Sequence, residues 1–283
     1  MNPSLKTITP VVLTFNEETN LRRNLDSLQW AERVVIVDSG STDATEAIAR
    51  SYANVVWHTR PFDSFRAQWE YAIHQTGVTS EYVLALDCDM EVSAKLLEEI
   101  ASKFVEGNYD GGVLPIDYRY YGRSLAGSIC PPQTRIFRRD KVKVTQLNHG
   151  HKFEVASSVY RFRNRLIHDD RKSLERWVEA QLRYQAENEA ELQNGHRGRA
   201  RDYARRMGLM PPIIGVLAYL RAGGPFKGAA AARYAYERMT TESILAVRLM
   251  DARLRKAEGR DQRSEVRDQR SEIRDQDDRT SGR

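Results

Sequence analysis

Residues 82–89 read YVLALDCD, an apolar run that ends in two carboxylates, Asp87 and Asp89. Such a run predicts a buried strand that carries acidic side chains to a site at its carboxyl end. Two carboxylates this close together repel each other unless a cation lies between them. Mg²⁺ or Mn²⁺ suits them, because these hard ions take oxygen ligands and share the rest of their shell with water and substrate phosphates. The alternative is a strand that runs into an acidic turn, since Asp is common in turns.

The sequence around this run alternates strand and helix patterns. Short apolar, β-branched runs occupy residues 9–15 and 33–38, and a weaker one occupies 55–58. Helix patterns cover the segments that follow the strands, at residues 18–28, 43–52, 64–76 and 94–105. The alternation predicts an α/β fold built from right-handed βαβ units, with a mostly parallel, Rossmann-like sheet and flanking helices. Ligands of such sheets bind beyond the carboxyl ends of the strands.

Three of the expected strand ends carry polar clusters, at residues 14–18, 38–43 and 87–89. Each cluster also has a purely structural explanation. Asp43 has the position of a helix cap, and Asn16 and Glu17 are typical of a helix N-terminus. A turn explains Asp38 less well, because a carboxylate followed by small residues can accept hydrogen bonds from a base or a ribose. We expect the three ends to converge on one crevice.

Three segments in this order carry a resemblance to a known family: VVLTFNEETNLRRNLDSL at 11–28, VVIVDSGSTDATEAIA at 34–49 and YVLALDCDMEV at 82–92. They resemble the nucleotide-binding half of the inverting family 2 glycosyltransferases, which have the GT-A fold. The resemblance implies that the first two motifs hold the nucleoside of a nucleotide-diphosphate sugar. It also implies that Asp87 and Asp89 hold a metal ion on the diphosphate. The donor-binding residues implied here are Thr14, Asn16, Glu17, Asp38 and Asp87.

A narrower resemblance covers HTRPFDSFRAQWEYAI at residues 58–73, which is similar to the donor-side segment of the bacterial lipopolysaccharide-core type. It implies that Arg60 contacts a phosphate or the donor sugar, with Gln68 beside it, and Arg is well suited to oxyanions. The alternative is an apolar helix face of Phe62, Phe65 and Trp69 with solvated arginines around it. For the three aromatic residues we favour this alternative.

The middle of the chain should supply the catalytic base, which takes the proton of the acceptor hydroxyl. Residues 146–154 read QLNHGHKFE and concentrate suitable groups, because His titrates near neutrality. We rank His151 first, followed by His149 and Glu154. Relatives commonly carry an acidic residue beside this His. The present sequence departs from that pattern, with His149 where Asp is expected and Lys152 where Glu is expected.

A charged stretch, HDDRK at residues 168–172, precedes Arg176 and Trp177. It resembles the basic and aromatic stretch that lies near the leaving diphosphate in relatives, which implies a donor contact from Arg171. The alternative is a helix N-terminus at Asp170 with solvated charges around it.

Composition narrows the class of protein. A chain of 283 residues can form one sizeable core with appendages. Its two cysteines, Cys88 and Cys130, imply no disulfide framework, and residues 1–10 lack the apolar core of a signal peptide. We therefore expect a cytoplasmic enzyme. The formal charge is +5, but 44 basic residues are interleaved with 39 acidic ones and no nucleic-acid module is recognisable, so we expect no nucleic-acid partner.

A basic cluster at residues 197–206 precedes an apolar stretch at 207–220. Pro211 and Pro212 interrupt this stretch, and it is shorter than the ~20 residues of a spanning helix. The pattern favours a peripheral segment that lies in the anionic inner face of the cytoplasmic membrane, followed by a basic, aromatic helix at 229–256. The alternative is a core helix packed on the catalytic domain.

The C-terminal residues have a different composition, with the heptad RDQRSEV at 260–266 repeated afterwards. Each heptad offers one apolar residue where a coiled-coil seam needs two, so we expect a disordered tail. The expected organisation is a nucleotide-sugar-binding half and an acceptor and catalytic half of one GT-A domain, then a helical membrane-interface segment, and then the charged tail. Their boundaries are 1–115, 116–200, 201–257 and 258–283.

Together these patterns predict a metal-dependent inverting glycosyltransferase that uses Mg²⁺ or Mn²⁺. Its donor is a nucleotide-diphosphate sugar, and its acceptor is a hydroxyl group of a lipid-linked glycan, in the lipopolysaccharide core or a related envelope glycan. One alternative is a membrane-associated nucleotide-binding pseudoenzyme or scaffold, because an acidic neighbour is missing at 149–151. A sugar nucleotidyltransferase is disfavoured, since it should show a Gly-rich, Arg-containing loop after the first strand, and residues 14–18 have none.

Overall fold

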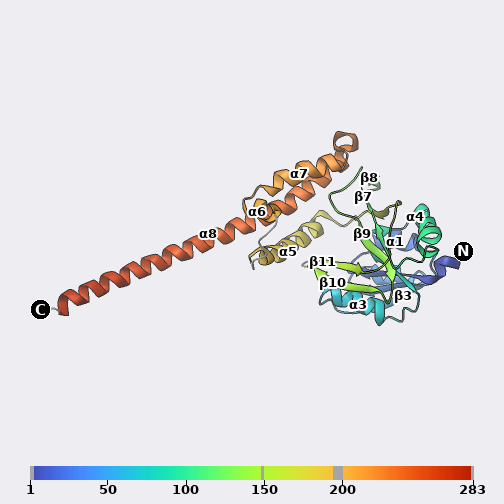
Figure 1. The fold of residues 1–283 in the computed structure, drawn as a ribbon, viewed down its shortest axis with the longest axis horizontal. Coiled ribbons are helices and arrows are strands. Elements are labelled where there is room, and N and C mark those ends of the chain that lie inside the picture. The colour runs from blue at the N-terminus through green and yellow to red at the C-terminus, as the bar shows by residue number, and fades with distance from the viewer. Residues whose placement is uncertain (1–2, 148–149, 194–199, 282–283) are drawn as a thin grey trace.

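A mixed seven-stranded sheet lies at the centre of the N-terminal part, and a group of helices extends from one side of it (Figure 1). The structure is a computed structural model that describes residues 3–147, 150–193 and 200–281. The strand order of the sheet is β12-β6-β9-β4-β1-β2-β3. Its strands are β1 (Ile8–Thr14), β2 (Val34–Asp38), β3 (Val55–Thr59), β4 (Tyr82–Asp87), β6 (Gly111–Leu114), β9 (Gln133–Arg138) and β12 (Val159–Arg161).

The parallel part of this sheet fixes the place of the site. β1 pairs in parallel with β2 and β4, and β2 pairs in parallel with β3. From β1 the chain builds outward to β2 and β3 on one side and then crosses to β4 on the other. The strand order therefore reverses between β1 and β4, and such a reversal opens a crevice at the carboxyl ends of the strands. β9 is antiparallel to both β4 and β6 and joins the two halves of the chain in one sheet.

Two smaller groups of strands accompany the central sheet. A four-stranded sheet has the order β5-β13-β7-β8, and β10 and β11 form an antiparallel hairpin. β13 is parallel to β7 and antiparallel to β5. The bounds are β5 (Met90–Glu91), β7 (Ile116–Tyr120), β8 (Arg123–Ser124), β10 (Val142–Leu147), β11 (Gly150–Val155) and β13 (Leu166–His168).

Alternating apolar residues bury both faces of the central sheet. On one face, Val12 and Ile36 belong to a core cluster that also contains residues of α1, α2 and α4. On the other face, Val11 and Val35 pack with Trp69 of α3 and with the β10–β11 hairpin. The helices that cover the sheet are α1 (Leu21–Asp26), α2 (Thr45–Arg50), α3 (Phe65–His74) and α4 (Ala94–Glu99), which continues into the π-helical η2 (Ile100–Val105); a 3-10 turn, η1 (Pro3–Thr7), precedes β1. Each of the four α-helices lies within the segment that its sequence pattern predicts.

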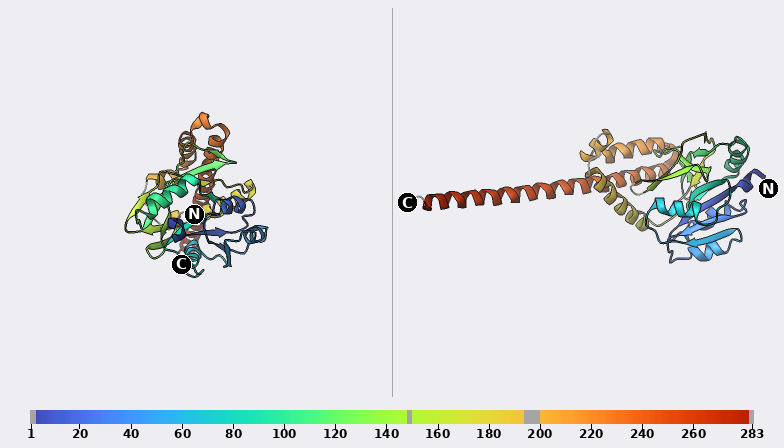
Figure 2. Two further views of the ribbon diagram at one scale, coloured as in Figure 1. Left: turned by 90° about the vertical axis from the view of Figure 1, so that its right-hand side faces the viewer. Right: turned by 60° about the horizontal axis from the view of Figure 1, so that its bottom comes forward.

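The C-terminal helices form a separate layer beside the sheet domain (Figure 2). They are α5 (Leu174–Gln193), α6 (Ala200–Arg206), α7 (Met210–Arg221), the 3-10 turn η3 (Gly224–Lys227) and α8 (Gly228–Ser281). α7 packs along the first part of α8, and the last part of α8 projects away from the rest of the molecule in both figures. Helices that lack tertiary packing are marginally stable in water. The expected disorder of the tail in solution stays a prediction.

The predicted fold class is confirmed: a mostly parallel sheet with flanking helices, in the GT-A arrangement, followed by a helical C-terminal extension. The domain boundaries stay predictions, although strands from both sides of residue 115 share the central sheet. Within the described ranges, none of the helices combines the length and the apolar character needed to cross a bilayer.

Candidate functional site

The three polar clusters meet at one edge of the central sheet. In the strand register, Thr14 at the end of β1 lies opposite Asp38 at the end of β2. Leu13 lies opposite Asp87, the last residue of β4. The segments that follow these strands therefore leave the sheet side by side, at the point where the strand order reverses. This geometry places the predicted nucleoside motifs next to the predicted metal motif.

Asp38 organises the loop that follows β2. Its buried carboxylate, only 2% exposed, accepts hydrogen bonds from the backbone N–H groups of Gly40 and Ser41 at 2.8 and 2.7 Å. It also accepts hydrogen bonds from the hydroxyl groups of Thr14 and Ser41 at 2.8 and 2.5 Å. Gly40 permits this tight turn, since its φ of +93° lies in the left-handed region. Four hydrogen bonds, three from its own loop and one from Thr14 of β1, give Asp38 a structural role, and its contact with a nucleoside stays a prediction.

Asn16 joins the loops after β1 and β2. It adopts a φ of +54°, which Asn tolerates better than most residues. Its backbone N–H donates to the hydroxyl of Ser41 at 2.7 Å, and its side-chain oxygen accepts the backbone N–H of Thr42 at 2.7 Å. Arg176 of α5 donates to the carbonyl oxygen of Asn16 at 2.5 Å. The loop is thus held from both sides before any ligand binds.

Asp87 and Asp89 differ in their surroundings. The Asp87 side chain is 39% exposed and receives a hydrogen bond from Nη2 of Arg135 at 2.8 Å. Burial is the largest single influence and raises the pKa of Asp87, but the charge and hydrogen bond of Arg135 together with the charges of His151 and His168 lower the pKa overall. The Asp89 side chain is 12% exposed, and Nε2 of His168 lies 3.5 Å from its Oδ2. Burial raises the pKa of Asp89, and the neighbouring charges of His168 and Lys172 only partly oppose it.

Glu17 forms a buried ion pair beside this motif. Its Oε1 lies 2.7 Å from Nζ of Lys172, and its Oε2 accepts a hydrogen bond from Asn20 at 3.0 Å. Burial is the main cause that raises the pKa of Glu17 to about 7, against the charge of Lys172. Asn20 also donates to Asp170 at 2.8 Å. The segment after β13 is therefore fastened to the loop after β1, beside Asp89.

The residues at this edge fit a divalent metal ion that relies on its substrate for the remaining ligands. Asp89 Oδ1 is buried and has no hydrogen-bond partner in the described part of the chain, so it is available as a ligand. Asp87 supplies a second, partly exposed carboxylate and His168 a nearby imidazole. Within residues 3–147, 150–193 and 200–281, no three His, Cys, Asp or Glu side chains form a complete metal cage. Ions that bind nucleotide diphosphates need no such cage, because phosphates and water complete their shell.

The three candidate bases lie in different environments. His151 is on the inner side of β11, with its ring centroid 5.3 Å from Trp69 and 4.8 Å from Phe153. Burial lowers the pKa of His151 to about 4, although the charge of Asp87 acts in the opposite direction. Glu154 points to the other side of the same strand, where it pairs with Lys152 at 3.0 Å. His149 lies outside the described residues. Of the two described candidates, only His151 faces Asp87.

The two predicted phosphate-binding arginines each have an acidic partner. Arg60 forms a bidentate pair with Asp63 at 2.9 and 2.7 Å and donates to Gln68 at 2.6 Å, so Gln68 lies beside it as the resemblance implies. Arg171 pairs with the buried carboxylate of Asp169 at 2.8 Å. A contact between either arginine and the donor stays a prediction.

The structure adds three residues that were not among the candidates. Arg135 of β9 is 5% exposed and bonds to Asp87, and its Nη1 is a buried donor for which the described residues supply no acceptor. His168 faces Asp89, and Lys172 pairs with Glu17. The charged stretch at 168–172 drew attention to the last two. Nothing in the sequence around Arg135 indicated that an antiparallel strand brings it to β4.

Two curated glycosyltransferases are similar in sequence to part of the chain. A lipopolysaccharide core biosynthesis glycosyltransferase of Rhizobium meliloti, LpsC, is 32% identical over 91 residues, which is 31% of this chain and 33% of the relative. An uncharacterized glycosyltransferase of Rickettsia bellii is 35% identical over 107 residues, which is 37% of this chain and 35% of the relative. The chain thus matches about a third of the length of these curated relatives.

Among solved structures, the TarS 1–349 fragment of S. aureus in complex with UDP-GlcNAc is similar, with a TM-score of 0.47 and 16% identity. That match covers 83% of this chain and 90% of the other. The sequence model of the family described as Glycosyl transferase family 2 matches residues 9–165. The matched segment contains β1, β2, β4 and all three strand-end motifs, and it makes up more than half of the 283 residues. The chain therefore belongs to glycosyl transferase family 2.

Proposed function

We propose that the protein is an inverting glycosyltransferase that moves a sugar from a nucleotide-diphosphate sugar to a hydroxyl group of a glycan. One observation carries the proposal: the polar ends of β1, β2 and β4 meet where the strand order reverses. Open α/β sheets bind nucleotides at such a point. Family membership and the local similarity to a lipopolysaccharide core glycosyltransferase support a cell-envelope glycan as the acceptor.

In this proposal Asp87 and Asp89 hold Mg²⁺ or Mn²⁺, and His168 lies beside Asp89. When bound, the ion supplies positive charge to the departing diphosphate. Arg135 orients Asp87 through its 2.8 Å hydrogen bond, and its unpartnered Nη1 adds a cation at the same place. The loops held together by Asn16 and Asp38 form the wall against which the nucleoside lies.

His151 is our proposed base. The acceptor hydroxyl attacks the anomeric carbon on the side opposite the diphosphate, and its proton passes to a neutral imidazole. With its pKa lowered to about 4, His151 is neutral near pH 7 but is a weak base, so proton acceptance depends on the charge of Asp87, which raises this pKa. Glu154 is a weaker choice, because it lies on the opposite face of β11 in an ion pair with Lys152.

We further propose that α7 rests on an anionic membrane surface that carries the acceptor. Met210, Gly215 and Ala218 are buried, while the opposite face of α7 exposes a stripe of apolar side chains. This stripe consists of Ile213, Val216, Leu217 and Leu220, which are 52%, 62%, 46% and 66% exposed. Phe226 of η3 is 95% exposed and stands beside the exposed Lys227. Apolar side chains next to cations favour the interface of a membrane with anionic lipids.

The test is to incubate the purified protein with a panel of nucleotide-diphosphate sugars, Mn²⁺ and an envelope glycolipid extract. A transferase releases free nucleoside diphosphate and labels the glycolipid. Release of pyrophosphate or synthesis of nucleotide sugar would indicate a nucleotidyltransferase instead. Binding without turnover of any donor would indicate a scaffold. The Asp89→Asn variant is the matched control, and it should show no metal-dependent binding of the donor.

A further inference from the structure

Arg238 on α8 is a cation for which the described residues supply no anionic partner. Its guanidinium lies over the ring of Tyr234, 5.6 Å from the centroid. Its Nε is buried, and no described residue accepts a hydrogen bond from it. None of the carboxylates in the described ranges forms an ion pair with this side chain. A buried donor without an acceptor costs free energy, so its presence points to a ligand that supplies one.

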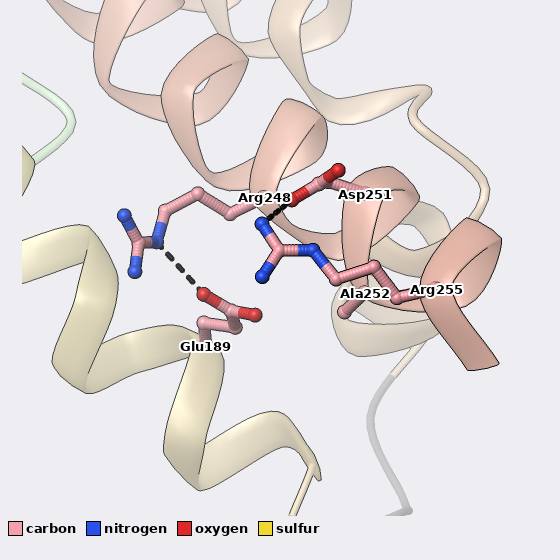
Figure 3. Close-up of a pocket in the computed structure, with 5 residues that line it drawn as sticks. All are labelled: Glu189, Arg248, Asp251, Ala252 and Arg255. Atoms are coloured by element: carbon pink, nitrogen blue, oxygen red, sulfur yellow. Dashed lines mark hydrogen bonds and ion pairs between the residues drawn. The ribbon is translucent and has the colours of Figure 1, made fainter. Parts of the chain in front are cut away.

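Four other arginines of the helical layer each pair with a carboxylate. Arg233 bonds to Glu237 at 3.1 Å, and Arg205 bonds to Glu242. Figure 3 shows a cavity between α5 and α8 where Arg248 pairs with Glu189 at 2.8 Å and Arg255 pairs with Asp251. The cations of that cavity are neutralised by the protein itself. Arg238 differs from all four of these arginines.

The position of Arg238 links it to the transfer site. The ring of Tyr118 packs 4.8 Å from His168, its neighbour in the β7–β13 register, and 6.3 Å from Tyr234. One turn beyond Arg238, Thr241 donates to Gln181 of α5 at 3.1 Å. Residues spaced by three or four lie on one face of a helix. Arg238 therefore faces the region between β7 and α5, next to the tyrosines that border His168.

The charge of Arg238 acts on this same group of tyrosines. Burial raises the pKa of Tyr118, Tyr120 and Tyr234, and Arg238 opposes that rise at each of them. Side-chain contacts link Arg238 to Tyr234, Tyr234 to Tyr118, Tyr118 to His168 and His168 to Asp89. Arg238 is therefore connected to the metal motif through three intervening side chains.

We propose that Arg238 binds an anionic group, a phosphate or a carboxylate, carried by the sugar acceptor. This inference rests on the proposed function and specifies the acceptor as an acidic glycan. The planar guanidinium offers two parallel N–H donors that match the oxygens of either group. The donor diphosphate is a poorer partner, because Arg238 is connected to Asp89 only through Tyr234, Tyr118 and His168.

The test measures the equilibrium binding of three probe sugars to the full-length protein by ligand-observed NMR. The probes are glucose 6-phosphate, glucuronate and uncharged glucose. We expect a charged sugar to bind at least about tenfold more tightly than glucose, as charge-assisted hydrogen bonds imply. Preference for the phosphate or for the carboxylate identifies which anion the site takes. Arg238→Gln should abolish the preference and Arg238→Lys should restore part of it.

Arg248→Gln is the matched control, because Arg248 lies on the same helix but is paired with Glu189. It should keep the wild-type preference. Equal binding of all three sugars to the wild type, or an unchanged preference in Arg238→Gln, would overturn the proposal. Circular dichroism of each variant checks the fold. Failure of the proposed function would show as an absence of donor turnover, which this binding assay does not measure.

Discussion

The environment of His151 makes the stability of the protein depend on pH in a way that can be measured. Its imidazole is enclosed by Phe65, Trp69 and Phe153, and burial lowers its pKa from 6.5 to about 4. In the unfolded chain the ordinary value of about 6.5 applies. Between these two values the unfolded state binds a proton that the folded state does not. The contribution of His151 to stability therefore falls as the pH falls through this window.

The size of this effect follows from the two pKa values. A shift of one unit corresponds to about 1.4 kcal/mol, and the window between pH 7 and pH 5 covers part of the full shift. His151 should therefore reduce the free energy of unfolding by about 2 kcal/mol when the pH changes from 7 to 5. The His151→Phe variant keeps an aromatic ring in the same cluster and removes the titrating group. It should lack this decrease.

The assay is urea unfolding of wild type and variant at pH 5, 6 and 7, followed by tryptophan fluorescence. The comparison of the two proteins cancels other groups, such as Glu17, whose raised pKa acts in the opposite direction. His74→Phe is the matched control, because His74 is exposed at the end of α3. If His151→Phe lost as much stability between pH 7 and pH 5 as the wild type, the imidazole would not be held neutral by burial, and the reasoning would be wrong.

Three further predictions concern the loop, the membrane face and the base. Asp38→Ala should lower the free energy of unfolding by about 3 kcal/mol in the same urea assay, because it leaves buried N–H and hydroxyl donors without an acceptor. Changing Leu217 and Leu220 to Ser should weaken flotation with anionic vesicles but leave the thermal unfolding temperature unchanged, since both side chains are exposed; equal flotation would exclude α7 as the membrane face. His151→Ala should slow turnover by ~10²–10⁴-fold without loss of donor affinity, whereas Glu154→Ala should stay near wild type. The reverse outcome would move the base to Glu154.

The fold could be predicted from local patterns. Each run that alternates with a helix pattern forms a strand, and the apolar periodicity explains why Val11 and Val12 enter cores on opposite faces of the sheet. Because parallel strands end at one edge, the meeting of Thr14, Asp38 and Asp87 also followed from the sequence.

The pairing of charges could not be predicted in the same way. Asp63, three residues from Arg60, holds that guanidinium, and Asp169 holds Arg171, so the two residues expected to bind phosphate are each engaged. Arg135 reaches Asp87 because β9 runs antiparallel to β4, a pairing of distant segments that no local pattern encodes. Local sequence thus indicates which residue types gather at the site. Side-chain pairing, which is local at Arg60 and Arg171 and non-local at Asp87, decides which of them remain available.

The central claim is that Asp87 and Asp89 hold a divalent metal on the diphosphate of the donor. It is tested most directly by titrating UDP and GDP into the protein by calorimetry, with Mn²⁺ and with EDTA. We predict that Mn²⁺ strengthens binding of one of these nucleotides to the wild type by at least about tenfold, because the metal adds contacts to the phosphates. Mn²⁺ should have no such effect on Asp89→Ala, which should keep the circular dichroism spectrum of the wild type. Equal affinity with Mn²⁺ and with EDTA in the wild type, or an unchanged effect of Mn²⁺ in Asp89→Ala, would contradict the account.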